Sequence, residues 1–171
     1  EIEGVSAEEK ADNLHKVGMG ALKFFIIKVH PRKKMIFNPE ESVELQGQTG
    51  PYIQYSYVRI YRMMLRVQNE NIDLSGWKNY TEIQPQEKEL LVALHNYPAI
   101  VQEAAGAYDP SLIANYCYAL AKSYHRFYHE LSIFNADTEP AKAFRLQLSQ
   151  TVGQVLKSGM ALLGVEMPNR M

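Results

Sequence analysis

Apolar residues in the second half of this chain recur every three or four positions over long segments. The clearest stripe, between about 111 and 134, consists of Ile113, Cys117, Leu120, Tyr124, Phe127, Leu131 and Phe134. This spacing puts side chains on one face of an α-helix, whereas a half-buried strand would alternate at every second residue. No alternating series occurs in the sequence. The pattern therefore predicts an all-α fold, in the form of a helix bundle.

The first part of the chain predicts one helix followed by irregular structure. Ser6 and Glu9 have the spacing of a capping box, and His30-Pro31 should end the helix that they begin. Its expected buried face consists of Leu14, Val17, Ala21 and Phe24 or Phe25. Residues 32–37 predict a short extended piece, after which Asn38-Pro39 is typical of a helix start.

Gly47 and Gly50 frame a joint, and we place a domain boundary there. Residues 1–46 are expected to form a short mixed α/extended N-terminal appendage, and residues 47–171 a helical bundle. A long helix should cover about 50 to 69. A helix from about 86 to 96 should be broken at Pro98 and followed by a second short helix.

The last predicted helix is capped by Asp137 or Thr138 and ends at Gly164. Its stripe to be buried consists of Ala141, Phe144, Leu148, Val152, Val155, Gly159 and Leu162.

The helix from 50 to 69 has an unusual polar side. Tyr52, Tyr55, Arg59, Arg62 and Arg66 share one face, beside an apolar face of Ile53, Tyr57, Ile60, Met64 and Val67. Aromatic rings stack on unpaired bases, and guanidinium groups pair with phosphates. On spacing alone, a solvated arginine face whose tyrosines fill the edge of the bundle is the simpler explanation.

A second basic face is predicted opposite the apolar stripe of the helix from 111 to 134. It consists of Tyr118, Lys122, His125 and His129, with Arg126 beside it and Tyr128 at its margin. His125 and His129 are four residues apart, a spacing that zinc sites use. However, the segment HRFYH lacks the glutamate of a metalloprotease motif, and Cys117 lies on another face. We therefore predict no metal site, and a face suited to phosphates.

Composition excludes several classes of protein. Among 171 residues there is one cysteine and a net charge of -1, so neither a disulfide nor a generally basic, DNA-binding surface is expected. No apolar run approaches the roughly 20 residues that span a bilayer. The acidic first residues do not resemble a signal peptide, and without an initiator Met we expect a fragment of a cytoplasmic protein. We find no glycine-rich phosphate loop, nucleophile elbow or paired carboxylates, and predict no catalytic residue.

Several segments, in this order, resemble the C-terminal part of class I arginyl-tRNA synthetases: VGMGALKFFII, IFNPEESVELQGQ, TGPYIQYSYVRI, the segment from ALHNYP to HELSIF, and VLKSGMALLGVEMPNRM. The resemblance covers essentially the whole chain and implies an α-helical anticodon-binding domain that binds an arginine tRNA. It also implies that Tyr52, Tyr55, Arg59, Tyr128 and Met171 match positions near the anticodon loop. From the helical faces, we add Arg62, Arg66, Lys122, His125 and Arg126 as candidate phosphate contacts.

The departures from this family limit what the chain can do. The H-I-G-H and K-M-S-K-S motifs of the ATP site are missing, so we expect no cofactor and no aminoacylation by this chain alone. The resemblance implies that the complete enzyme uses ATP and Mg²⁺, and we expect that enzyme to be a monomer. The segment ALKFFIIKV predicts an apolar surface through which the fragment self-associates.

Two alternatives stay open. One is the anticodon-binding domain of another class I synthetase. The other is a helical protein-interaction module whose tyrosine-rich face binds a protein instead of RNA.

Overall fold

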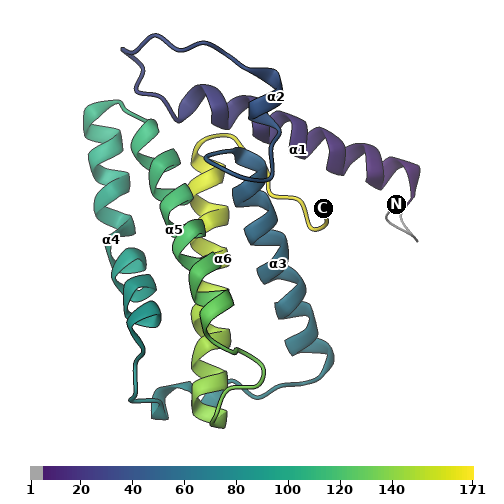
Figure 1. Ribbon diagram of the computed structural model, residues 1–171, viewed down its shortest axis with the longest axis vertical. Helices are drawn as coiled ribbons and strands as arrows, with labels where there is room; N and C mark the ends of the chain where they lie inside the picture. Colours follow the sequence, from purple (N-terminus) through teal and green to yellow (C-terminus); the bar gives the residue numbers. More distant parts are fainter. Residues whose placement is uncertain (1–5) are drawn as a thin grey trace.

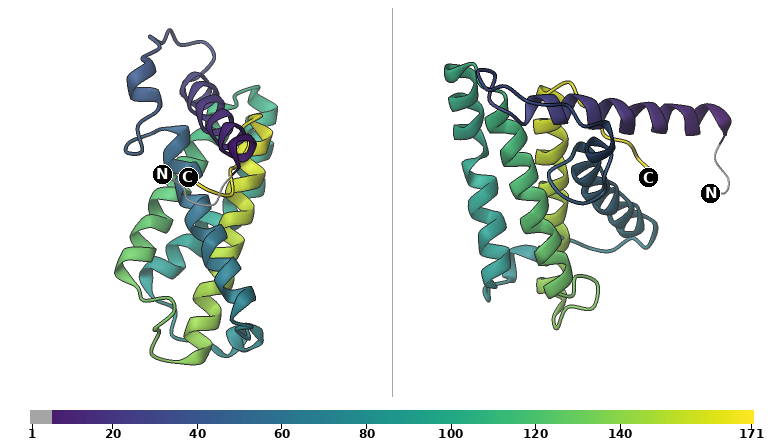
Figure 2. Two further views of the ribbon diagram at one scale, coloured as in Figure 1. Left: turned by 90° about the vertical axis from the view of Figure 1, so that its right-hand side faces the viewer. Right: turned by 45° about the horizontal axis from the view of Figure 1, so that its top comes forward.

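The computed structural model describes residues 6–171, and these residues contain helices but no β-strand. Four long helices lie side by side in a bundle: α3 (Gly50–Asn69), α4 (Pro85–Ala107), α5 (Ser111–Glu130) and α6 (Glu139–Leu162) (Figure 1). α1 (Ala7–Ile27) crosses one end of the bundle and extends beyond it (Figure 2). The short helices α2 (Pro39–Ser42) and η1 (Ser75–Asn79, a 3-10 helix) lie in the connections. The all-α prediction is confirmed. No helix among these residues is long and apolar enough to cross a membrane.

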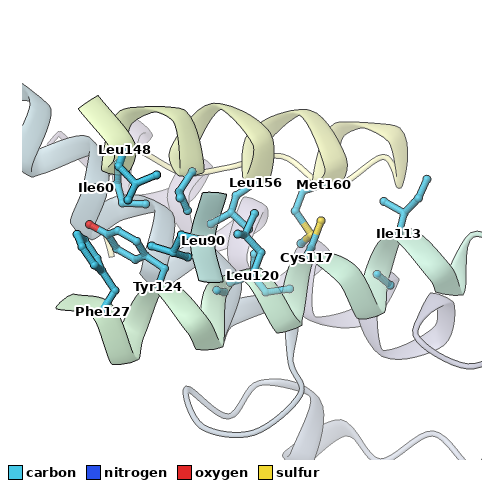
Figure 3. Packing of buried hydrophobic residues seen from close by; sticks show 14 of the residues in the cluster. Ile60, Leu90, Ile113, Cys117, Leu120, Tyr124, Phe127, Leu148, Leu156 and Met160 are labelled. Carbon is cyan, nitrogen blue, oxygen red and sulfur yellow. The ribbon is translucent and has the colours of Figure 1, made fainter. Parts of the chain in front are cut away.

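The core lies between α5 and α6, with α3 and α4 closing its sides. Ile113, Cys117, Leu120, Tyr124 and Phe127 are buried along α5, as their spacing predicts (Figure 3). They face Leu148, Leu156 and Met160 of α6. α5 ends at Glu130, so the last two members of the predicted stripe, Leu131 and Phe134, lie in the following turn and are only half-buried.

Side-chain caps fix where the helices begin. The hydroxyls of Ser6 and Thr49 accept from the backbone amides of Glu9 and Tyr52, at 3.1 and 3.2 Å. α3 then covers residues 50–69, the range that the sequence predicts. Thr138, the second of the two proposed caps, accepts from Ala141 at 3.3 Å.

The predicted break at Pro98 is wrong, because α4 continues through this residue to Ala107. Proline removes one backbone hydrogen bond, but packing along a helix can outweigh that loss. Five residues before Pro98, the carbonyl of Ala93 accepts a bond from the hydroxyl of Tyr116 on α5, at 2.9 Å. α4 is therefore held to its neighbour close to the proline.

Part of the buried face predicted for α1 is wrong. Leu14 is 66% exposed and Val17 is half-buried, because they line an open pocket that Tyr55 of α3 and Met171 of the tail also line. Ala21, Phe24 and Phe25 are buried where α1 crosses α3. At this crossing a Cβ on Gly50 would lie 2.4 Å from the carbonyl oxygen of Gly20, so the two backbones touch.

Two further predicted faces are confirmed over most of their length and differ only towards the C-terminal ends of their helices. On α6, Leu162 is exposed and Val155 half-buried, whereas Leu156 and Met160 are fully buried. On α3, Met63 is buried. Met64 and Val67 are half-buried. These helices contact neighbours on two sides, so their buried faces are wider than a single stripe.

Candidate nucleic-acid interface

A hollow of about 360 Å³ opens between α3, the end of α5, the turn after α5 and the C-terminal tail. We call it the cationic hollow. Its lining residues are Tyr55, Val58, Arg59, Arg62, Met63, Arg66, Tyr128, Phe134 and Met171. Six of these nine are site residues that the sequence predicts, although they come from three separate segments.

Arg59 occupies the centre of this group. Its guanidinium carbon lies 5.0 Å from the ring centroid of Tyr55 and 4.7 Å from that of Tyr128. Nη2 of Arg59 also donates to the hydroxyl of Tyr55 at 3.2 Å. Tyr55 precedes Arg59 by one helical turn, whereas Tyr128 reaches it from α5. Both tyrosine rings are partly exposed, at 42% and 38%, so this aromatic and cationic surface is open to a ligand.

Arg66 forms the far end of the cationic hollow. Its guanidinium carbon lies 4.1 Å from the ring centroid of Phe134, and its Nε donates to Glu70 at 2.7 Å. The sequence predicts Phe134 as core, and its place in the hollow was missed. One feature of the sequence could have indicated this place for Phe134. The residue continues the apolar stripe beyond the end of a helix, where an apolar side chain can pack away from the core.

Tyr52 and His125 lie outside the hollow, in an aromatic patch between α3 and α5. The ring of Tyr52 is 5.5 Å from that of Tyr118 and 6.3 Å from that of His125. Burial raises the pKa of the Tyr52 hydroxyl. Burial, and then the charges of His129 and Arg59, hold the pKa of His125 below its usual value.

The structure does not bring Lys122 or Arg126 to the hollow. Lys122 is exposed on α5. Arg126 pairs with Glu89 of α4, whose carboxylate also accepts from the hydroxyl of Ser123 at 2.6 Å. The charge of Arg126 is therefore partly compensated within the protein.

Neither metal binding nor thiol chemistry has support in residues 6–171. No group of three or more histidine, cysteine, aspartate or glutamate side chains is placed there to hold a metal ion. His125 and His129 lie with their ring centroids 4.3 Å apart, without a third such partner. Burial raises the pKa of the Cys117 thiol to about 12, which makes it a poor nucleophile.

Comparison with protein families matches residues 53–171 to the DALR anticodon binding domain. This chain belongs to that family. The match begins within α3 and ends at Met171, so it spans every residue that lines the cationic hollow. In the DALR domain described here, the hollow is therefore formed entirely by family-matched sequence.

Relatives of this DALR domain are arginine–tRNA ligases. The chain is 45% identical over 170 residues to the Arginine--tRNA ligase of Flavobacterium psychrophilum, and 43% identical over 176 residues to that of Phocaeicola vulgatus. Each alignment covers 99% of this chain but only 28% of the relative. The solved Thermus thermophilus arginyl-tRNA synthetase superposes with a TM-score of 0.81 and 27% identity, over 95% of this chain and 28% of that one. This chain thus spans little more than a quarter of the proteins that it matches.

Proposed function

We propose that this chain binds the anticodon stem-loop of an arginine tRNA, as the C-terminal module of an arginine–tRNA ligase. The observation that carries this proposal is Arg59, held between the partly exposed rings of Tyr55 and Tyr128 in a hollow that Met171 also lines. Proteins recognise RNA sequence mostly at unpaired loop bases, which stack on aromatic rings and on guanidinium planes. The hollow offers both kinds of surface.

We propose that the arginines along α3 contact phosphates of the RNA backbone. Arg62 and Arg66 line the same hollow as Tyr55, about two and three turns further along the helix. A base bound near Tyr55 would bring its neighbouring phosphates towards this row. Lys122 and His125 are proposed as outer phosphate contacts, and Tyr52 as a second stacking surface. Arg126 is assigned a smaller contribution, because Glu89 already pairs with it.

The complete ligase would use ATP and Mg²⁺ to activate arginine and then transfer it to the tRNA. We place those steps in sequence outside this chain, since it contains no ATP-site motif of this family. We expect no aminoacylation when the chain is incubated with ATP, arginine and tRNA, and turnover above a protein-free blank would contradict this. The proposed location is the cytoplasm, where the tRNA is charged.

The exposed apolar side chains of α1 and the loop after it suggest self-association of the isolated chain. Leu14, Ile26, Ile36 and Phe37 are all exposed. We expect a concentration-dependent dimer in analytical ultracentrifugation and a monomeric complete enzyme. A monomer at all concentrations of the isolated chain would contradict the first expectation.

The decisive test is a fluorescence titration with anticodon stem-loop RNA from an arginine tRNA and from a non-cognate tRNA, at several salt concentrations. We expect tighter binding of the cognate RNA. If about five phosphates are neutralised, log affinity should fall against log salt with a slope of about -3.5 to -4.5. Tighter binding of the RNA for another amino acid would favour the domain of a different class I synthetase, whereas equal, weak binding of both would mean that the domain by itself holds only phosphates.

A protein-interaction module gives a different result in the same titration. Contacts with a protein through a few aromatic side chains release few counterions, so binding that depends on those contacts should change little with salt. A flat salt response would therefore favour that alternative over the proposed one.

A further inference from the structure

We propose that Gln54 is a positioning residue whose amide holds the C-terminal tail, and with it Met171, at the cationic hollow. This inference rests on the proposed function of the hollow. Gln54 is not among the residues that line the hollow, although it directly precedes Tyr55, which is.

Gln54 joins three segments that are far apart in the chain. It lies on α3 and is fully buried, at 0% exposure. Its Nε2 donates to the backbone carbonyl of Lys16 on α1 at 3.0 Å, and to that of Glu166 in the tail at 2.8 Å. Both partners are acceptors, so the position needs a side chain with two donors on one atom, which a glutamine amide provides.

The close crossing of α1 and α3 makes this bridge possible. A Cβ on Gly20 would lie 2.5 Å from Nε2 of Gln54, so a glycine there leaves room for the amide. The contact between the Gly20 and Gly50 backbones keeps α1 near enough for one side chain to span the gap.

The other polar ties of the tail are more exposed than the Gln54 bond, and beyond Glu166 the tail is also packed through half-buried Met167 and buried Pro168. Lys23, which is half-buried, donates to the carbonyl of Gly164 at 2.5 Å in a bond exposed to solvent. Arg170 and Glu9 lie 3.8 Å apart with both side chains nearly half exposed, and such pairs contribute little. Val165 is buried and anchors the start of the tail. The Gln54 bond follows directly, at Glu166, and sets the direction in which the tail leaves that anchor.

Of the two polar atoms of the Gln54 amide, Nε2 makes two hydrogen bonds and Oε1 makes none among the described residues. This oxygen is buried. An unpaired buried acceptor lowers stability, and an apolar side chain of similar size would avoid that loss. An apolar side chain could not bond the two carbonyls, however. We therefore infer that Gln54 serves to position α1 and the tail and not to increase stability.

The consequence for the site follows from chain order. Tyr55 comes directly after Gln54 on α3, and Met171 lies five residues beyond Glu166; both line the cationic hollow. The single amide of Gln54 therefore sets the tail against the same helical turn that presents Tyr55. Loss of the amide should release Met171 while leaving Tyr55 in place.

The test uses Gln54→Leu and methyl NMR of protein labelled at methionine methyl groups, without RNA. We expect the Met171 signal to move to the position of a solvent-exposed methionine. The signal of Met160, which is buried in α6, should stay and report that the bundle is folded. Gln150→Leu is the matched control, because the Gln150 side chain accepts from Gln147 within α6 and the change should leave Met171 unchanged. An unmoved Met171 signal in folded Gln54→Leu would overturn the proposal.

A second measurement covers the case in which Gln54→Leu does not fold. In the wild-type protein, the side-chain amide protons of Gln54 should show nuclear Overhauser contacts to protons of Glu166 or Met167, and slow exchange with solvent. Absence of these contacts in the folded wild type would overturn the proposal without any variant.

RNA binding then connects the tail to function. We expect Gln54→Leu and Met171→Ala each to weaken stem-loop binding on the order of tenfold. The double variant should bind within about twofold of Met171→Ala, because both changes remove the same contact. Additive losses would show that Gln54 acts by another route and overturn the inference. If wild-type protein binds no stem-loop, the proposed function fails, whereas the methyl spectra still decide whether Gln54 holds the tail.

Discussion

The guanidinium of Arg59 on α3 lies 4.7 Å from the ring of Tyr128 on α5, in a contact that joins two helices across the mouth of the cationic hollow. The same guanidinium lies 5.0 Å from the ring of Tyr55 on its own helix. Arg59 is thus held in place before any ligand arrives. A preordered arginine loses less side-chain entropy on binding than a free one.

Removal of either tyrosine ring should weaken RNA binding more than it weakens the fold. We expect Tyr55→Ala and Tyr128→Ala each to cost about 1–3 kcal/mol in stem-loop binding, the usual effect of losing one base-stacking surface. The melting temperature should change little, since both rings are partly exposed. Tyr108→Ala, at an 89% exposed position at the end of α4, is the control and should bind like wild type. If Tyr55→Ala and Tyr128→Ala both bind the RNA like wild type, these tyrosines are not part of the binding site.

Arg66→Ala should weaken binding of all tRNAs about equally. A phosphate contact carries no sequence information, and its loss should reduce the salt slope by about 0.7 to 0.9. Lys157→Ala removes an exposed charge from α6, away from the hollow, and should leave the slope unchanged. Titrations at four or more salt concentrations measure both values. A changed preference between cognate and non-cognate RNA would instead assign Arg66 to a base.

Glu89→Ala should strengthen RNA binding slightly. The change frees Arg126 from its ion pair and removes a negative charge of α4 that lies beside the basic face of α5. The stability loss should be below about 1 kcal/mol, because both side chains of the pair are partly exposed. In the Arg126→Ala background the same substitution should give a smaller gain. Weaker binding by Glu89→Ala would mean that the pair orients Arg126 for the RNA.

Arg145→Ala should destabilise the fold strongly. Arg145 donates to buried Glu87 at 2.7 Å and to the carbonyl of Ser132 at 2.6 Å. Loss of the arginine leaves the Glu87 carboxylate buried without its cation, a change that costs about 3–5 kcal/mol. Chemical denaturation should show this loss, and the double variant Glu87→Gln, Arg145→Met should recover part of it. An unfolding midpoint equal to wild type in Arg145→Ala would contradict the role of this ion pair.

The unfolding free energy should decrease as pH falls from about 7 towards 5, partly through His125. Its pKa in the fold is lowered, chiefly by burial, so the unfolded chain binds a proton more readily than the folded chain. Stability is therefore complete above the unfolded pKa of about 6.5 and is lost as pH falls below it. His125→Gln should flatten this part of the profile, whereas His15→Gln, at an exposed position of α1, should not. Identical profiles for wild type and His125→Gln would contradict the effect.

Local chemistry made the helices predictable. A threonine cap at Thr49 and a proline in the first turn fix the start of α3, and the residues that follow favour a helix. The buried side of α5 followed from periodicity in the same way. Pro98 misled the prediction because its local cost was weighed without the packing of α4 on α5, which no local signal reveals.

The candidate site was likewise predictable only in part from the sequence. Helical spacing gathered Tyr55, Arg59, Arg62 and Arg66 on one face, and the resemblance supplied Tyr128 and Met171. The pairing of Arg126 with Glu89, the place of Phe134 in the hollow and the bridge at Gln54 all depend on contacts between segments distant in the chain. Spacing within one helix carries no information about such contacts.

The sequence by itself determined the helices, most of their buried faces and the family to which the chain belongs, because caps, breakers and periodicity act over a few residues. Only the tertiary structure decided which exposed side chains meet. The cationic hollow requires α3, α5, the turn after α5 and the tail at one place, and that arrangement follows from how the buried faces pack together. Backbone contact between Gly20 and Gly50, and the buried amide of Gln54, then fix the angle of α1 and the path of the tail.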